Sequence, residues 1–258
     1  MAYDRRGHRR LGALVGEGVV DLADVVGHPA FPATMELLVS RNGGTVLDAA
    51  RAALERNGAP ALPLETTPLL APLMPSSLRS LHARHGERAV VGPDDELRWP
   101  DGGRWLDYAP KVAAIIGRPG RDLELEEAAA AIFGYALVND FVVRDESGRE
   151  SARQSIPVAL GPCIATLDEV DPPSVTVVAR VDGEPWARRS LAAASGVFAD
   201  VIARASGEEE LGPGDAFAVE PFGISFAEDL GKRLHPGALV ELEADGIGAL
   251  RSRIGRRD

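Results

Sequence analysis

The alternation of apolar and polar positions predicts a chain built mostly from short strands joined by tight turns. Two apolar runs, at 10–15 and 18–22, are separated by Gly16–Glu17, which is the pattern of a β-hairpin. Other apolar runs follow turn signals such as Pro–Gly and Asp–Gly. The further strands expected in this way cover residues 111–117, 135–143, 175–181, 184–191, 215–219, 238–244 and 248–254.

Three other segments have apolar residues at helical spacing. The segments 47–56 and 192–205 each carry an apolar stripe along one face. A third helix is expected over 122–131, with Asp122 as its N-cap and glutamates in the first turn, where the helix dipole favours acidic side chains. Together with the strands, these helices predict an α+β fold.

A proline-rich stretch between residues 60 and 75 interrupts the periodic pattern. It predicts a boundary between a small N-terminal α/β domain, residues 1–74, and a larger C-terminal domain, residues 75–258. An apolar fraction of 45% over 258 residues is enough for a real core.

The charge pattern narrows the choice of partner. The net charge is −11, and no basic block stands out, which argues against nucleic acid or an anionic membrane as the partner. No apolar stretch is long enough to span a bilayer, so we expect a cytoplasmic protein. Cys163 is the only cysteine, which excludes an intrachain disulfide. It lies in an apolar run, where a thiol acts as a small hydrophobe rather than a nucleophile.

Several segments, in this order, resemble the fumarylacetoacetate hydrolase family. The longest is VAAIIGRPGRDLELEEAAAAIFGYALVNDFVVRD at 112–145, followed by LGPCIATLDEVDPP at 160–173 and RVDGEPWARRSL at 180–191. RLGALVGEGVVDLADV near the start and LHPGALVELEADGIGALRSRI at the end belong to the same set. The resemblance covers nearly the whole chain.

This resemblance implies a small N-terminal domain and a mixed β-roll or β-sandwich-like C-terminal domain that carries the active site, commonly in a homodimer. Members typically bind Mg²⁺, Mn²⁺ or Ca²⁺. They act on small carbonyl and carboxylate substrates such as β-dicarbonyl or acylpyruvate-type acids, by C–C hydrolysis, decarboxylation, hydration or isomerisation.

The metal ligands of the family are largely replaced in this chain. The family's metal-binding strand reads Asp-Tyr-Glu-x-Glu, and a later Asn-Asp supplies a third carboxylate. Here the strand reads Asp107-Tyr108-Ala109-Pro110-Lys111, so only Asp140 remains. A hard divalent cation needs about six oxygen ligands, and a lysine adds repulsion. We expect Asp107 to point to the opposite face of the strand and to be a poor substitute. The sequence therefore predicts no metal and no other cofactor.

Lys111 has two interpretations. It could replace the cation, keep Asp140 ionised and donate hydrogen bonds to a bound carboxylate or enolate. A lysine in such a pocket could also act as a base or form a Schiff base. Alternatively it only fills an abandoned metal site, since a buried unpaired Asp140 would cost about 3–5 kcal/mol. Both interpretations predict that Lys111 lies beside Asp140.

The other candidates are less specific. His85 suits acid–base work because an ordinary histidine titrates near neutrality, although a solvated loop histidine is as good an explanation. Glu220 is a general base if its loop borders the active site, and a surface acid otherwise. Arg144 with Asp145 suits a substrate carboxylate or an internal ion pair. The candidate substrate-binding residues are Tyr108, Arg144, Arg153 and Gln154.

Three functions remain open. We favour a metal-independent enzyme acting on an enolisable carbonyl or carboxylate substrate by isomerisation, cyclisation, dehydration or lyase chemistry, in specialised biosynthesis. The alternative is a non-catalytic relative that binds a small molecule or a partner protein. A weaker alternative is a metal-dependent C–C hydrolase or decarboxylase with relocated ligands. A pocket filled by Phe222 and Phe226 would favour the non-catalytic relative.

Overall fold

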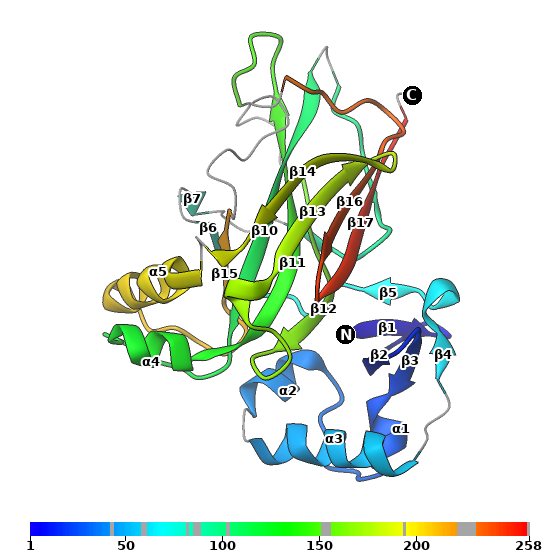
Figure 1. Ribbon diagram of the computed structural model, residues 1–258, viewed down its shortest axis with the longest axis vertical. Helices are drawn as coiled ribbons and strands as arrows, with labels where there is room; N and C mark the ends of the chain where they lie inside the picture. The colour runs from blue at the N-terminus through cyan, green and yellow to red at the C-terminus, as the bar shows by residue number, and fades with distance from the viewer. Residues whose placement is uncertain are drawn as a thin grey trace.

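The computed structural model describes residues 1–41, 44–57, 61–80, 83–84, 89–101, 104–150, 156–192, 195–220 and 231–256. Within them the chain forms an α+β fold in which strands predominate, as the pattern predicts (Figure 1). The strands make three sheets, which we call the N-terminal, central and outer sheets.

The N-terminal sheet has the strand order β4-β3-β2-β1-β5 and is flanked by three helices. Its β2–β3 hairpin turns at Gly16, whose φ of 58° suits glycine, and so confirms the hairpin expected there. The elements of this part are β1 (Ala2–Arg5), β2 (His8–Val15), β3 (Gly18–Asp21), α1 (Leu22–Val26), α2 (Met35–Ser40), α3 (Gly44–Asn57), β4 (Leu62–Pro63), a 3₁₀ turn (Leu64–Thr66) and β5 (Leu69–Leu70).

Asp21 ties this sheet to the first helix. Its side chain accepts the Asp24 backbone N–H at 3.0 Å as the N-cap of α1, and it also accepts the Tyr3 hydroxyl at 2.6 Å. Arg10 donates to both Asp21 oxygens, at 2.7 and 2.8 Å. Burial together with the bond to Asp21 raises the pKa of Tyr3 to about 12. A buried polar network therefore fixes where the sheet ends and the helix begins.

The central sheet has the order β7-β6-β15-β10-β11-β12-β8, and the antiparallel pair of β10 and β11 runs through its middle. Every residue of β10 is buried. At Gly134 a Cβ would collide with the Ala165 carbonyl, so the close approach of β11 and β12 requires glycine there. The strands are β6 (Leu78–Ser80), β7 (Ala83–Arg84), β8 (Val90–Val91), β10 (Trp105–Ile116), β11 (Ile132–Arg144), β12 (Val158–Thr166) and β15 (Ala216–Val219).

The outer sheet, with the order β14-β13-β16-β17-β9, faces the central sheet and closes an apolar core with it. Asp182 and Gly183 have φ values of 51° and 80°, which fit the tight hairpin that this dipeptide predicts between β13 and β14. The remaining elements are β9 (Glu96–Leu97), a 3₁₀ turn (Pro172–Ser174), β13 (Thr176–Val181), β14 (Glu184–Ser190), β16 (Leu239–Ala244) and β17 (Gly248–Ile254).

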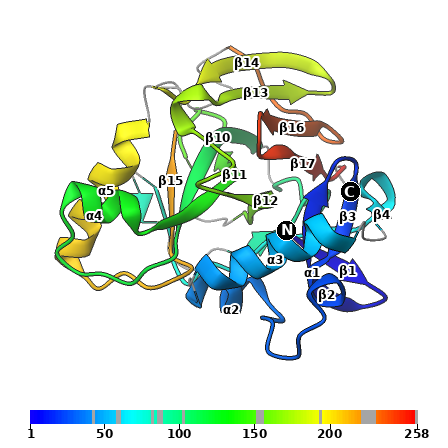
Figure 2. The same ribbon diagram turned by 60° about the horizontal axis from the view of Figure 1, so that its bottom comes forward.

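A second apolar core lies on the other face of the central sheet. Figure 2 shows the central sheet between the outer sheet and helices α2 and α3. Met35 and Leu38 of α2 pack in one cluster with Phe133 of β11 and Val158 of β12. The central sheet is therefore covered on both faces.

Helices α4 (Leu125–Ala130) and α5 (Ser195–Glu208) pack on each other beside the central sheet (Figure 1). Helix α4 begins later than expected: its N-cap is Glu124, whose side chain forms a capping box with Glu127. Asp122, which the sequence suggested as the cap, instead adopts a φ of 51° in the preceding turn. No helix in the described ranges is long and apolar enough to cross a membrane.

Candidate active site

One face of the β10–β11 pair carries a row of charged residues. Cross-strand register pairs Trp105 with Arg144 and Ala109 with Asp140. Because side chains alternate along a strand, these positions share a face with Asp107 and Lys111. The expectation that Asp107 points to the opposite face is therefore wrong: it lies two residues from Ala109, and a spacing of two keeps the face.

Lys111 and two carboxylates form the centre of this face. The Lys111 Nζ lies 2.8 Å from Asp140 Oδ2 and 3.3 Å from Glu220 Oε1. The Lys111 and Asp140 side chains are each only 4% exposed, against 14% for Glu220. The structure confirms the expected proximity of Lys111 and Asp140 and brings Glu220 to the same point from the end of β15. We call these three residues the lysine centre.

The lysine centre is held by backbone geometry. Lys111 is in the middle of β10, and Asp140 lies diagonally across from it on β11. Glu220 directly follows β15, whose last residue, Val219, pairs with Val112 of β10. Charges this deep in a sheet are stable only when paired and hydrogen-bonded, and the ammonium meets this need for both acids. A lysine paired with a buried carboxylate, beside a second carboxylate that is more exposed, can bind and polarise a carbonyl group.

A second ion pair lies further along the same face. Arg144 donates from Nε to Asp107 Oδ2 at 2.7 Å, and Asp107 is fully buried. Arg144 also donates to the Gly148 carbonyl at 2.9 Å. The sequence suggested that Arg144 pairs with Asp145, but in the structure it pairs with Asp107. Asp145 instead accepts bonds from Ser147 and the Arg149 backbone, and these hold the pKa of its carboxyl below the usual value.

Tyr108 lies one residue away from this face and points to the opposite side of β10. There its ring contacts Phe141, at 6.4 Å between centroids, and Trp186, at 6.1 Å. Burial, together with the nearby Asp107 charge, raises the pKa of Tyr108. Its predicted role in substrate binding stays a prediction, and the geometry places it in the core between the two sheets.

The other candidates fall outside the described residues. His85, Arg153, Gln154, Phe222 and Phe226 all belong to segments whose placement the structure does not give. Their roles stay predictions, including the choice between an open pocket and one filled by phenylalanine.

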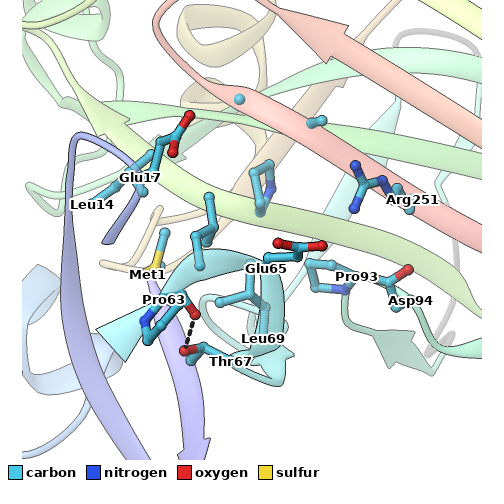
Figure 3. Close-up of a pocket in the computed structure, with 14 residues that line it drawn as sticks. Met1, Leu14, Glu17, Pro63, Glu65, Thr67, Leu69, Pro93, Asp94 and Arg251 are labelled. Atoms are coloured by element: carbon cyan, nitrogen blue, oxygen red, sulfur yellow. Dashed lines mark hydrogen bonds between the residues drawn. The ribbon is translucent and has the colours of Figure 1, made fainter. Parts of the chain in front are cut away.

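Two pockets lie away from the lysine centre, near the N-terminal sheet. One, of about 420 Å³, is bordered by the β2–β3 turn, the segment 63–69 and β17, with Glu17, Glu65 and Arg251 at its edge (Figure 3). A second, of about 250 Å³, reaches Cys163. Burial raises the pKa of the Cys163 thiol, which donates to the Ile247 carbonyl at 3.0 Å. This supports the structural role expected for Cys163.

A family model decides the broad assignment. The model described as "Fumarylacetoacetate (FAA) hydrolase C-terminal" matches residues 80–255. This chain belongs to the fumarylacetoacetate hydrolase family. The match covers the outer sheet and the central sheet apart from most of β6, and it includes every residue of the lysine centre.

Curated relatives and solved structures agree with the family. The chain is 25% identical over 276 residues to a mitochondrial oxaloacetate tautomerase of Rattus norvegicus, covering 96% of this chain and 87% of that protein. A mitochondrial oxaloacetate tautomerase of Xenopus laevis is 28% identical over 171 residues, 63% of this chain and 54% of that protein. The maleylpyruvate hydrolase of Sphingobium sp. SYK-6 is 26% identical, with a TM-score of 0.79 over 100% of both chains.

The maleylpyruvate hydrolase also corrects one expectation. It has been solved in complex with manganese(II) and pyruvate, with the same coverage of both chains. The prediction that this chain has no cofactor is contradicted by that neighbour, and a divalent metal belongs among the cofactors to be tested.

The described residues alone do not fit such an ion. Within the ranges that the structure places, no group of three or more histidine, cysteine, aspartate or glutamate side chains could hold a metal. At the lysine centre, the Lys111 ammonium contacts both Asp140 and Glu220, the acids that would otherwise bind a cation. We therefore assign no chemical step to a metal.

Proposed function

We propose that this chain is an enzyme that interconverts the keto and enol forms of a small oxo acid. The observation that carries the proposal is the buried Lys111 ammonium, in contact with Asp140 at 2.8 Å and with Glu220 at 3.3 Å. A cation in a dry site stabilises an enolate far more strongly than it would in water. The oxaloacetate tautomerases among the relatives support an enolisable oxo acid as the substrate class.

In this proposal the two carboxylates have different roles. Asp140 is the shorter contact and the more buried acid, so it holds Lys111 in place. Glu220 is the longer contact and the more exposed acid, so it can leave the ammonium and act as a general base.

The proton transfers then balance. Glu220 removes a proton from the carbon beside the carbonyl, and that C–H electron pair forms the C=C bond. Negative charge develops on the carbonyl oxygen, which takes a proton from Lys111 and becomes an enol. The proton on Glu220 returns to Lys111 across their direct contact, which restores the starting state without a co-reactant. The reverse sequence converts enol to keto.

Hydrolysis of a C–C bond is the second candidate. It is favoured by the likeness to maleylpyruvate hydrolase, which covers both chains completely. Cleavage beside a carbonyl also passes through an enolate, so Lys111 would serve both reactions. The two are separated by their products, because cleavage releases two acids and tautomerisation releases none.

The experiment follows enol-to-keto conversion of oxaloacetate by its ultraviolet absorbance, with chromatography of the products. We expect conversion faster than in buffer, and a kcat about 10²- to 10⁴-fold lower in Glu220→Gln. Glu243→Gln, which neutralises a carboxylate that is 55% exposed on β16, is the matched control and should keep the wild-type kcat. Wild-type activity in Glu220→Gln would contradict the proposed base. Release of oxalate and acetate, the two acids formed when water is added across the C2–C3 bond, would favour the hydrolase.

In this proposal the chain forms a homodimer, as family members commonly do, and it binds a small carboxylate substrate in the cytoplasm, whereas the tautomerase relatives are named as mitochondrial. Light scattering checks the first point. The expected mass is twice the 27.3 kDa of one chain, and the mass of one chain would contradict it.

A further inference from the structure

Two arginines contact the ring of Trp105 at one end of the charged face. The guanidinium carbon of Arg233 is 4.6 Å from the ring centroid, and that of Arg144 is 5.9 Å away. Trp105 is only 7% exposed, yet its indole Nε1 has no hydrogen-bond partner among the described residues. A buried N–H without an acceptor costs free energy, so it suits a site where a ligand supplies the acceptor.

The neighbouring residue, Lys232, is placed in a similar way. Its ammonium lies 5.0 Å from the ring centroid of Trp186, which in turn contacts Tyr108. Trp186 is the extra residue of a β-bulge, because Pro185 pairs with Arg180 while Ala187 pairs with Ala179. Bulges of this kind redirect a side chain and are frequent beside binding sites. The bulge thus brings an aromatic ring under Lys232.

Neither Lys232, which is half-buried, nor Arg233, which is exposed, has a carboxylate partner within the described ranges, unlike two partly buried arginines of the chain. Arg10 pairs with Asp21, and Arg144 with Asp107. The chain as a whole carries 39 acidic against 28 basic residues, and Lys232 is one of its two lysines. Two adjacent cations backed by indole rings therefore concentrate positive charge in an otherwise acidic molecule.

We propose that Trp105, Lys232 and Arg233 form an anion-binding subsite for an acidic group of the substrate, distant from its reacting carbonyl. Arginine binds two oxygens of a carboxylate or phosphate at once, lysine adds a point charge, and the indole N–H adds a third donor. The assignment to the substrate rests on the proposed function; the binding of an anion does not.

The position of the subsite sets the length of the ligand. Trp105 and Lys111 share a face of β10 and are six residues apart, which is roughly 20 Å along a strand. The side chains shorten this span, but a four-carbon diacid such as oxaloacetate cannot reach both ends. The preferred substrate is therefore an extended oxo acid with a carboxylate or phosphate at its far end.

Binding is tested first, without turnover. Inorganic phosphate and succinate are titrated into the wild-type protein by calorimetry, and into the double variant Lys232→Gln/Arg233→Gln. We expect at least one anion to bind and the double variant to bind it at least tenfold more weakly. The anion that binds with the higher affinity shows whether the natural end group is a phosphate or a carboxylate. Trp105→Phe, which keeps a ring but removes the N–H, should weaken binding by a smaller factor.

A matched control removes the same charge elsewhere. Arg118→Gln/Arg121→Gln changes two exposed arginines before α4 and should leave binding unchanged. If neither anion binds, or if the two double variants weaken binding equally, the subsite is wrong.

Kinetics then tests the link to the substrate. For an extended oxo diacid, the double variant should raise KM at least tenfold with little change in kcat, while oxaloacetate kinetics stay the same. Equal KM values for the diacid in wild-type and variant would overturn the assignment to the substrate. A third outcome is that the wild-type protein binds the anion, the double variant does not, and neither protein shows any turnover. This outcome would overturn the proposed function and keep the subsite.

Discussion

Lys111 is the residue on which the site most depends. It is a cation that is 4% exposed, and its ammonium contacts two carboxylates of the sheet, which favours their ionised form. The same contact explains why it could contribute to catalysis, since an ammonium held by carboxylates cannot swing away from a bound carbonyl. Structure and chemistry therefore impose the same requirement on this position.

Replacing Lys111 by methionine tests the structural requirement. We expect Lys111→Met to lower the free energy of unfolding by about 3–5 kcal/mol, because it removes the ammonium that contacts two buried carboxylates. Urea denaturation measures the change. Lys232→Met, at the only other lysine, is the control and should lower it by less than about 1 kcal/mol, since it loses only a cation–π contact. Equal effects would argue against the lysine centre as a buried ion pair.

A glutamate at the same position tests the metal question. Lys111→Glu removes the repelling charge and adds a third carboxylate next to Asp140 and Glu220, and hard divalent cations favour such oxygen clusters. We expect the variant to bind Mn²⁺ at least tenfold more tightly than the wild-type protein, by calorimetry. Lys111→Gln, which removes the charge without adding a carboxylate, is the control. Equal Mn²⁺ affinity in all three proteins would show that the ion does not bind at this point.

At the scale of elements, the antiparallel β10–β11 pair organises the site. Its strands are long enough to carry the lysine centre at one position and the Asp107–Arg144 pair four residues away. Neighbouring strands on both sides keep the register fixed, so the two charged groups cannot shift relative to each other. The join between β3 and α1 is fixed in a similar way, by the buried Asp21 carboxylate, which accepts several hydrogen bonds.

That join gives a pH prediction. Burial opposes ionisation of Asp21, but bonds from Arg10, Tyr3 and the Asp24 N–H outweigh it and hold the pKa of this carboxyl below its usual value. A lowered pKa adds stability at pH values above the unfolded pKa, near 4, and that stability is lost as the pH falls through the folded pKa. We expect Asp21→Asn to cost about 1–3 kcal/mol at pH 7 and progressively less below about pH 4.

Thermal unfolding of both proteins from pH 7 to pH 2.5 measures this difference. Asp48→Asn, at a carboxylate that is 71% exposed on α3, is the control and should change stability little at any pH. A cost for Asp21→Asn that stays constant across the range would contradict the role given to the ionised carboxylate.

At the scale of the whole molecule, the central sheet connects all the layers. One core packs it against the outer sheet, and the other packs it against the N-terminal helices. Phe133 of β11 belongs to the second core together with Leu11 and Met35. The boundary expected between residues 74 and 75 therefore crosses a shared core, and we expect the two parts to unfold together.

Scanning calorimetry tests this cooperativity. We expect one transition whose calorimetric and van't Hoff enthalpies agree. Phe133→Ala should lower the free energy of unfolding by about 3–5 kcal/mol and keep a single transition. Two separate transitions would instead support independent domains on either side of the proline-rich stretch.

Local patterns in the sequence were sufficient for much of the fold. Asp182–Gly183 predicts its hairpin because few other residues tolerate the positive φ of that turn. The predicted start of α4 was wrong because Asp122 and Glu124 are both acidic and either could cap the helix. Only the hydrogen bonds of the capping box identify Glu124 as the N-cap. The pairing of Arg144 with Asp107 was missed because Asp107 was expected on the opposite face of its strand. Residues two apart on a strand share a face, so Asp107 lies on the same face as Ala109.

The sequence alone predicts the family, the α+β class, the strand-rich pattern and a lysine at a position where relatives carry an acid. These follow from local preferences and motif spacing, which act over a few residues. The folded structure was needed to show that Glu220 contacts Lys111, that Asp107 pairs with Arg144, and that Trp105 and Trp186 lie beneath Arg233 and Lys232. Such contacts join residues more than thirty positions apart, and strand register and sheet packing set them, so no local pattern encodes them.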